Sequence, residues 1–197
     1  MKGPDLNILL TITGIGQEKA KRAVQNTLGF SPDLVISTGF AGALKEGIGA
    51  GDLVLDSSRS DPRTSGILSA LSEKYAITVH RGAFFSQDKT LFTREEKMRG
   101  GENNGAIAVE MESRGIHDLC REKKIPFCSL RAVSDTLDQD LPLSVGAWGA
   151  EGGVSGRFLA ALFFRPREWK SFFRLFRSSR KAERSLSAIL TLLMGSL

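Results

Sequence analysis

The clearest structural signal in the chain lies in residues 106–123, which read AIAVEMESRGIHDLCREK. The first four residues, Ala106–Val109, are apolar without alternation, which indicates a short strand covered on both faces. Apolar residues then recur at helical spacing in Ser113–Lys123. Two acids, Glu110 and Glu112, stand where the strand turns into the helix. A buried strand that leads directly into a helix is the repeating unit of an α/β layered domain.

The same alternation continues in both directions from this unit. The sequence predicts further strands at 8–13, 34–38, 52–56, 77–80 and 126–133, and helices at 17–28, 67–75 and 94–98. Unbroken apolar runs separated by helices favour a mainly parallel or mixed sheet. The predicted fold class is therefore α/β.

The composition changes after residue 140. Five glycines fall within residues 146–156, which is typical of a flexible loop or lid. A helical segment from about 167 to 193 follows a break at Pro166. We therefore divide the chain into a main domain at 1–156 and a basic, amphipathic helical extension at 157–197, packed on or projecting from the same domain.

The formal net charge of +5 is carried by this extension. Residues 151–197 contain three acids and nine basic residues: Arg157, Arg165, Arg167, Lys170, Arg174, Arg177, Arg180, Lys181 and Arg184. Aromatic residues recur at i, i+3, i+4 and i+7 from Trp169, so they form one stripe beside a basic sector. Arg180 falls within that stripe, and we expect the pair Ser178-Ser179 to kink or end the first half of the helix.

Two interpretations of the extension remain open. An aromatic stripe flanked by Lys and Arg is typical of a helix that lies on anionic lipid. The alternative is a C-terminal helix that docks its aromatic face on the sheet. Nucleic acid is not an expected partner, because the main domain is nearly neutral and contains no binding motif.

The remaining composition excludes several classes of protein. Two cysteines, Cys120 and Cys128, do not make a disulfide framework, and two histidines, His80 and His117, do not make a histidine-rich metal site. We expect no metal, buried reduced thiols, and no role for the histidines. No apolar run is long enough to span a membrane, and the N-terminal residues lack the pattern of a signal peptide. The predicted location is the cytoplasm.

Glycines follow two of the predicted strands, in Thr13–Gly16 and in Thr38–Gly42. Turns of this kind let a ligand approach the backbone, although they are also common as plain tight connections. Two acids, Glu112 and Asp135, follow the last two predicted strands, and we expect both to open on the same edge of the sheet. Carboxylates there suit the binding of sugar hydroxyls and general acid chemistry, whereas the simpler alternative is that both cap helices.

Three motifs together resemble the nucleoside phosphorylase superfamily: Val109–Glu112, Arg131–Asp135, and Thr38–Gly42 followed by Gly51–Val54. Their order and spacing are most similar to those of the methylthioadenosine/S-adenosylhomocysteine nucleosidases, from about Thr11 to Asp138. The resemblance implies a three-layer α/β/α fold with a central mixed sheet. It also implies an enzyme whose main domain cleaves a ribosyl N-glycosidic bond.

The resemblance assigns roles to individual residues. It implies that Asp135 is the general acid that protonates N7 of a purine, and that Glu112 holds the ribose hydroxyls. Met111 would pack beneath the sugar, while Arg131 and Ser134 would position the Asp135 loop and help to close the site. The other candidates for substrate binding are Val109, Phe40, Ala41, Gly42 and Gly14. Glu110 is expected to be structural.

Three features depart from the nucleosidase pattern. The glutamate that activates water in that branch has no counterpart upstream of Thr13, so we name no base. Phe40 stands where a small polar residue is usual, and the connection at 56–68 is short. An apolar wall and an open entrance favour a bulky hydrophobic 5′ substituent. The basic tail also resembles that of the hopanoid-biosynthesis-associated phosphorylases, which implies adenosylhopane as the substrate.

We therefore expect cleavage of the N-ribosidic bond of an adenine nucleoside that carries a hydrophobic 5′ group. No cofactor is expected, with phosphate a candidate co-substrate, and the protein is expected to be a homo-oligomer with peripheral membrane contact through residues 167–193. One alternative is a nucleosidase for a soluble nucleoside such as methylthioadenosine, S-adenosylhomocysteine or futalosine. The other is a nucleoside-binding protein without turnover.

Overall fold

The computed structural model describes residues 6–142 and 168–197. Along the chain these residues form, in order, α1 (Gln17–Thr27), the short 3-10 helix η1 (Leu28–Phe30), β1 (Val35–Ala43), β2 (Leu53–Asp56), α2 (Pro62–Tyr75), β3 (Val79–Ser86), α3 (Arg94–Asn104), β4 (Ala106–Glu110), α4 (Ser113–Lys123), β5 (Phe127–Asp135) and α6 (Trp169–Met194). The predicted glycine-rich loop at 146–156 and the predicted domain boundary at 156 lie outside the described residues.

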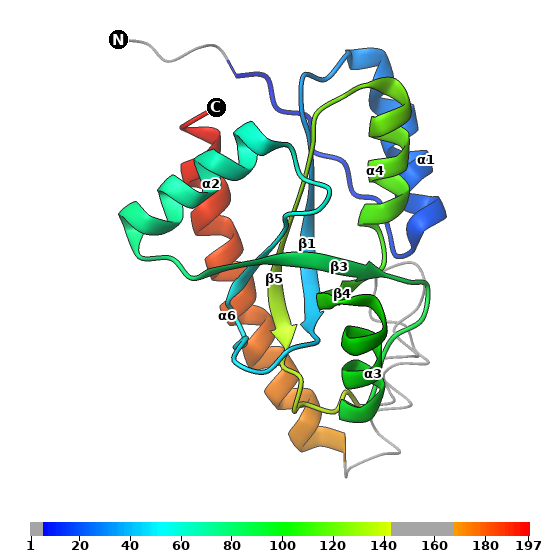
Figure 1. Ribbon diagram of the computed structural model, residues 1–197, viewed down its shortest axis with the longest axis vertical. Helices are drawn as coiled ribbons and strands as arrows, with labels where there is room; N and C mark the ends of the chain where they lie inside the picture. The colour runs from blue at the N-terminus through cyan, green and yellow to red at the C-terminus, as the bar shows by residue number, and fades with distance from the viewer. Residues whose placement is uncertain (1–5, 143–167) are drawn as a thin grey trace.

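The five strands form one mixed sheet in the order β1-β4-β3-β2-β5, which closes into a small barrel because β1 also pairs with β5. β1 and β5 are parallel to each other, whereas β2, β3 and β4 are parallel to one another and antiparallel to that pair. Figure 1 shows α2 and α6 together on one side of the strands, and α1, α3 and α4 on the other. The prediction of an α/β fold with a mixed sheet is confirmed.

The apolar side chains of the strands are covered on both faces, as their unbroken apolar runs indicate. One cluster fills the barrel: Ala41, Ala43, Ile48, Val54, Phe84, Ala108 and Val133. A second joins β2 and β5 to α2 and α6: Leu53, Leu55, Leu68, Leu71, Cys128, Leu130, Ala132, Ala182, Ile189 and Leu193. A third joins α1 and α4 to β5: Ala20, Val24, Ile116, Leu119, Cys120 and Phe127.

The carboxyl ends of β4 and β5 meet at one residue of β1. The β1–β4 ladder is short, with Gly42 opposite Val109 and Ala43 opposite Ala108. A shift in the β1–β5 register after Ala41 places Gly42 opposite Asp135 as well. The sequence analysis expects Glu112 and Asp135 at one edge of the sheet. In the structure β4 and β5 are antiparallel, and their ends meet because the tip of β1 overlaps both.

Local capping explains where several helices begin and end. Asp61 accepts a hydrogen bond from the Thr64 backbone N–H at 2.9 Å, and Pro62 occupies the first turn, so α2 begins five residues before the predicted start at 67. Thr93 and Glu96 form a reciprocal capping box, and α3 continues to Asn104 instead of ending near 98. The predicted bounds of α4 are confirmed.

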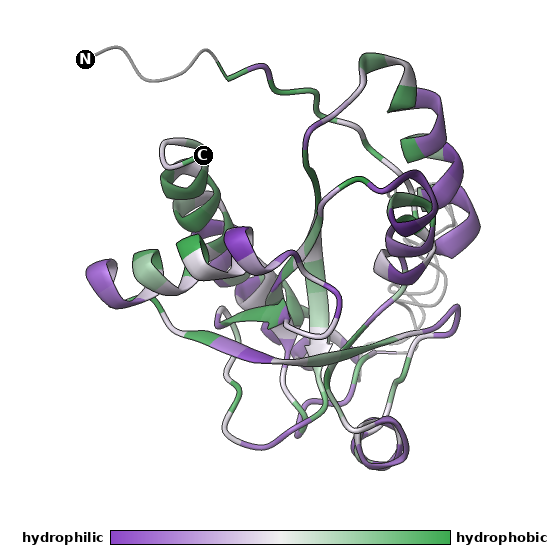
Figure 2. Ribbon diagram, turned by 45° about the horizontal axis from the view of Figure 1, so that its top comes forward, coloured by the Kyte–Doolittle hydropathy of each residue, from purple (hydrophilic) through white to green (hydrophobic). Residues whose placement is uncertain are grey.

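The predicted strand at residues 8–13 is wrong. These residues form no strand, and several apolar side chains are exposed, among them Leu10 (83%) and Ile12 (92%). Figure 2 shows hydrophobic colouring along much of this segment, which leads from the N-terminal trace to α1. A β-rich composition predicts a strand only where a neighbouring strand is present to pair with it.

The predicted break at Ser178-Ser179 is also wrong, because α6 is one continuous helix of 26 residues. Its C-terminal half is anchored in the core by Ala182, Ile189 and Leu193, each 0% exposed. Tertiary packing of this half outweighs the weak helix propensity of two serines. The alternative in which the aromatic stripe docks on the sheet does not fit Phe173 and Phe176, which are 60% and 51% exposed.

The close crossing of α1 and α4 depends on a glycine and leads to a prediction. A Cβ atom on Gly115 in α4 would lie 2.7 Å from the carbonyl oxygen of Gln17 in α1. Gly115→Ala should therefore lower the free energy of unfolding by about 1–3 kcal/mol, because neither backbone can yield without a shift of the helices. Gly66 is the matched control, since it lies within α2 with no atom near its Cβ position. Gly66→Ala should raise stability by up to about 1 kcal/mol.

Urea unfolding of both variants measures the difference. Equal effects of the two substitutions would contradict the close crossing.

Candidate active site

The candidate site is built around Gly42, where β1, β4 and β5 meet. A Cβ atom at this position would lie 2.8 Å from Oδ2 of Asp135 and 3.2 Å from Cγ1 of Val109. The absence of a side chain therefore allows the carboxylate of Asp135 to lie directly against the β1 backbone. The structure thus brings together three of the predicted site residues, Gly42, Val109 and Asp135.

Beneath this junction, Glu110 and Arg131 form a buried ion pair. Nη2 of Arg131 lies 3.0 Å from Oε2 of Glu110, and the two residues are 1% and 4% exposed. Nη2 also donates to Ser37 Oγ at 3.0 Å, which connects the pair to β1. Arg131 therefore contacts acids on the β4 side of the site rather than Asp135, and its position suits the support of Glu110 and Glu112.

The Glu110 carboxylate accepts four hydrogen bonds in addition to its ion pair with Arg131. Its donors are the Ser86 hydroxyl, the Ser113 hydroxyl at 2.8 Å, and the backbone N–H groups of Glu112 at 3.0 Å and Ser113 at 2.7 Å. Burial alone would raise the pKa of Glu110, but the charge of Arg131 and these hydrogen bonds outweigh it and hold the pKa below its ordinary value. These contacts support the predicted structural role of Glu110.

Glu112 is held much more loosely. Its carboxylate accepts from the backbone N–H groups of Gly16 and Met111, both at 3.3 Å, and lies 3.8 Å from Arg131 Nη2. Burial raises the pKa of Glu112; the charge of Arg131 opposes this effect and the charge of Glu110 adds to it. Two long hydrogen bonds leave these oxygens able to exchange their partners for hydroxyl donors. The expected contact of the first glycine turn with the site is made by Gly16, not Gly14.

Asp135 is held at both carboxylate oxygens. Ser134 Oγ donates to Oδ1 at 2.7 Å, which supports the predicted role of Ser134 in positioning this acid. Lys97 Nζ lies 2.6 Å from Oδ2. Lys97 is 0% exposed and was missed by the sequence analysis, because a lysine in the charged run Arg94–Arg99 is expected to be solvated. The sequence contained one sign that Lys97 is buried. Gly101 lies one helical turn after Lys97 on the same side of α3, and both residues are buried.

The other predicted residues surround this centre. Ala41 is buried at 3% exposure, and its carbonyl lies 3.3 Å from Ser134 Oγ. Phe40 is 46% exposed, and Met111 is half-buried beside Glu112. Gly14 has a φ of +74°, in the left-handed region that favours glycine, and no contact with the acids.

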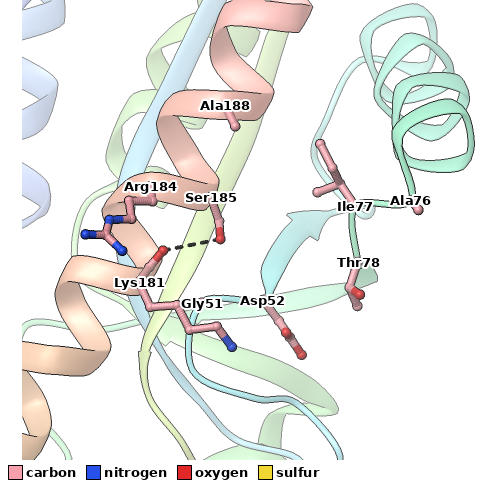
Figure 3. A pocket seen from close by; sticks show the side chains of 9 residues that line it. All are labelled: Gly51, Asp52, Ala76, Ile77, Thr78, Lys181, Arg184, Ser185 and Ala188. Atoms are coloured by element: carbon pink, nitrogen blue, oxygen red, sulfur yellow. Dashed lines mark hydrogen bonds between the residues drawn. The ribbon is translucent and has the colours of Figure 1, made fainter.

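Two hollows lie away from these residues. One, of about 400 Å³, is lined by residues from the β2 turn, the end of α2 and one side of α6: Gly51, Asp52, Ala76, Ile77, Thr78, Lys181, Arg184, Ser185 and Ala188. Figure 3 shows the Lys181 stem crossing Gly51 while Arg184 points away from Asp52. Another, of about 460 Å³, is lined by Lys21, Asp118, Arg121 and Glu122. Neither contains a predicted site residue.

The two histidines and the two cysteines have other environments. His80 pairs with Asp52 at 3.0 Å, and His117 packs edge-to-face on Phe127. Cys120 and Cys128 are free and buried, and burial raises the pKa of both thiols to about 11. Among residues 6–142 and 168–197, no three His, Cys, Asp or Glu side chains are grouped as metal ligands.

The lowered pKa of Glu110 leads to a prediction about stability and pH. Because Glu110 is more acidic in the folded state, its contribution is present above pH about 4.5 and is lost as the pH falls through the folded-state pKa. Glu110→Gln should reduce the free energy of unfolding at pH 7 by roughly 3 kcal/mol, since Arg131 is then buried without its partner. The variant should also lose less stability than the wild type between pH 5 and pH 3.

Urea titrations at several pH values provide the measurement, with Glu112→Gln as the control. Its pKa shift has the opposite sign, so this variant should keep the acid-induced loss at least as steep as in the wild type. If Glu110→Gln lost as much stability between pH 5 and pH 3 as the wild type does, the stabilising role assigned to the Glu110 carboxylate would be contradicted.

Comparisons with known proteins identify the family of this chain. The family model described as "Phosphorylase superfamily" matches residues 5–61 and 56–162. The 5′-methylthioadenosine/S-adenosylhomocysteine nucleosidase of Staphylococcus aureus is 27% identical over 180 residues, which cover 77% of this chain and 78% of the relative.

Two solved structures share the fold, each with a TM-score of 0.71. One is the 5′-methylthioadenosine/S-adenosylhomocysteine nucleosidase of Neisseria meningitidis in complex with methylthio-immucillin-A, which is 21% identical over 94% of this chain and 80% of its own. The other is the futalosine hydrolase of Helicobacter pylori, 17% identical over 94% and 78%. The resemblance inferred from the three motifs is confirmed, as is the class of enzyme that it implied. The chain belongs to the phosphorylase superfamily.

Proposed function

We propose that this protein cleaves the N-ribosidic bond of an adenine nucleoside at the junction of β1, β4 and β5. The observation that carries the proposal is the convergence on Gly42 of Asp135 and of Val109, which precedes Glu112 by three residues. One acid is fixed at both oxygens and the other is loosely held. This difference suits two separate tasks on the two halves of a nucleoside.

The fixed acid, Asp135, suits contact with the purine of the nucleoside. Departure of a purine requires that the electron pair of the C1′–N9 bond move onto the base, and a proton or hydrogen bond at N7 stabilises the leaving group. Asp135, oriented by Ser134 and Lys97, is the group for that contact: as a carboxylic acid it transfers its proton to N7, and the carboxylate that remains is paired with Lys97. Such preorganisation avoids rearrangement during the reaction.

The loosely held acid suits the sugar. Glu112 can accept hydrogen bonds from ribose hydroxyls in place of its two long backbone contacts. Loss of the base leaves a sugar with oxocarbenium character, which nearby negative charge stabilises. Half-buried Met111 adjoins Glu112 in the chain and would pack beneath the sugar. The attacking group is not assigned, so hydrolysis and phosphorolysis both remain as outcomes of the assay below.

The comparisons favour a soluble substrate over a lipid nucleoside. The named relatives are nucleosidases for methylthioadenosine and S-adenosylhomocysteine, and a futalosine hydrolase shares the fold. Substrates of this class are therefore the first to test. The exposed ring of Phe40 supports the second candidate, a nucleoside with a bulky hydrophobic 5′ group such as adenosylhopane.

The α6 helix supports contact with a membrane surface. At about 100° per residue, Phe173 and Phe176 lie opposite the buried line of Ala182, Ile189 and Leu193. The aromatic stripe therefore faces away from the strands, and basic residues flank it: Lys170, Arg174, Arg177, Arg180, Lys181 and Arg184. This is the arrangement of a helix that lies on anionic lipid. In the described part of the chain, no helix is long and apolar enough to cross a membrane.

Contact with anionic lipid would place the protein at the cytoplasmic face of the membrane. The expected homo-oligomer stays a prediction.

Release of adenine tests the reaction. The wild type should release the base from 5′-methylthioadenosine, S-adenosylhomocysteine or an adenosine with a long 5′-alkylthio chain, each assayed with and without phosphate. Asp135→Asn should lower kcat by about 100-fold or more, because the neutral amide cannot donate or share the proton. Asp138→Asn is the control, since Asp138 is exposed and binds Arg94 outside the site. Binding without release in the wild type would indicate the non-catalytic alternative and contradict the proposal.

Liposome flotation tests the membrane contact. The full chain should float with vesicles of phosphatidylcholine and phosphatidylglycerol, and not with phosphatidylcholine alone. Phe173→Ser with Phe176→Ser should reduce the bound fraction about 10-fold, because the buried apolar area drives insertion. The control is Leu10→Ser with Ile12→Ser, which removes two side chains of still greater exposure outside α6. Equal flotation of the α6 variant and the wild type would contradict the contact.

A further inference from the structure

Lys97 is a buried cation that contacts the candidate site. It lies in α3 at 0% exposure, and an apolar side chain of similar length would fill the same space without the cost of removing a charge from water. A buried ammonium therefore indicates a specific partner. Three acceptors surround Nζ: Asp135 Oδ2 at 2.6 Å, the Thr136 carbonyl at 2.9 Å and the Gln139 carbonyl at 2.7 Å.

These three contacts leave Lys97 no further proton to donate. They also fix the turn that follows β5, because two of the acceptors are backbone groups of residues 136 and 139. The Asp135 carboxylate is then held by a cation on Oδ2, by the Ser134 hydroxyl on Oδ1 and by the bare backbone of Gly42. Its rotation about the last side-chain bond is blocked.

We infer that Lys97 is a positioning residue for the reaction, which orients the Asp135 carboxyl group toward the base and supplies the counter-charge of the carboxylate that remains after proton transfer. This inference rests on the proposed function of Asp135 but concerns a different residue on a different element. Lys97 does not reach the substrate, because all of its donors are used internally. Its effect should therefore appear in the chemical step, where orientation matters most, rather than in substrate binding.

Arg94 offers a matched control on the same helix. It also holds the segment after β5, through Asp138 at 2.7 Å from its Nε and through its own backbone N–H to Asp140 at 2.9 Å. Its side chain is 44% exposed and does not contact Asp135. Arg94→Met thus removes an anchor of the same segment without touching the carboxylate.

The experiment compares steady-state kinetics of adenine release from the best substrate for Lys97→Met and Arg94→Met. Lys97→Met should lower kcat by about 100-fold with KM changed by less than about 3-fold, whereas Arg94→Met should change kcat by less than about 3-fold. A kcat in Lys97→Met within 3-fold of that in Arg94→Met would overturn the inference. A loss confined to KM would overturn it as well.

Folding is monitored by circular dichroism, since removal of one partner leaves Asp135 buried without its cation. If Lys97→Met does not fold, Lys97→Arg and Lys97→Gln decide the question. A higher kcat in the Arg variant, which retains the charge, supports the inference, and equal values overturn it. A wild type that releases no base contradicts the proposed function, whereas an active wild type with an active Lys97→Met contradicts the role of Lys97 alone.

Discussion

The ion pair between Arg131 and Glu110 is the interaction on which the arrangement of the site depends. Two charges are removed from water here, which costs free energy unless their attraction and further hydrogen bonds offset it. Glu110 accepts from four donors besides Arg131, and Nη2 of Arg131 binds both Glu110 and Ser37, whereas Nε and Nη1 of Arg131 are buried without a partner among the described residues. Because Arg131 lies on β5 and Glu110 at the end of β4, the pair fixes these two strands against each other. Met111 and Glu112 follow Glu110 directly along the chain, and Ser134 and Asp135 follow Arg131 by three and four positions.

The second constraint is the overlap of three strand ends at Gly42. Antiparallel strands normally place their carboxyl ends at opposite edges, yet β1 overlaps β4 by only two residue pairs, so the two ends coincide. The register shift after Ala41 brings Asp135 of β5 to the same residue. Glycine is required because any side chain would displace the carboxylate. The result is one rigid acid and one loosely held acid on a common backbone junction, which is the physical basis of the proposed division between base and sugar.

Much of the fold and of the candidate site could be predicted from the sequence, and the predictions that were wrong have identifiable physical causes. The acids Glu112 and Asp135 were recognisable because each follows a buried strand, and α4 was recognisable from its periodicity. The relative direction of the strands could not be predicted, because an apolar run does not specify which strand pairs with it or in which direction. Lys97 was missed because its neighbours are charged and its burial depends on contacts with residues 136 and 139, far along the chain. The exposed segment at 8–13 shows the converse error, in which local β propensity is present and no strand pairs with it.

The most direct test of the account is a crystal structure of the protein with adenine bound. N7 of the base should lie within hydrogen-bonding distance of the Asp135 carboxyl group, with Lys97 still paired to Oδ2. The side of the base that would carry the ribose should face Glu112 and Met111. Adenine bound elsewhere, for example in the hollow lined by Gly51 and Lys181, with the β1–β4–β5 junction empty, would contradict the assignment of the site.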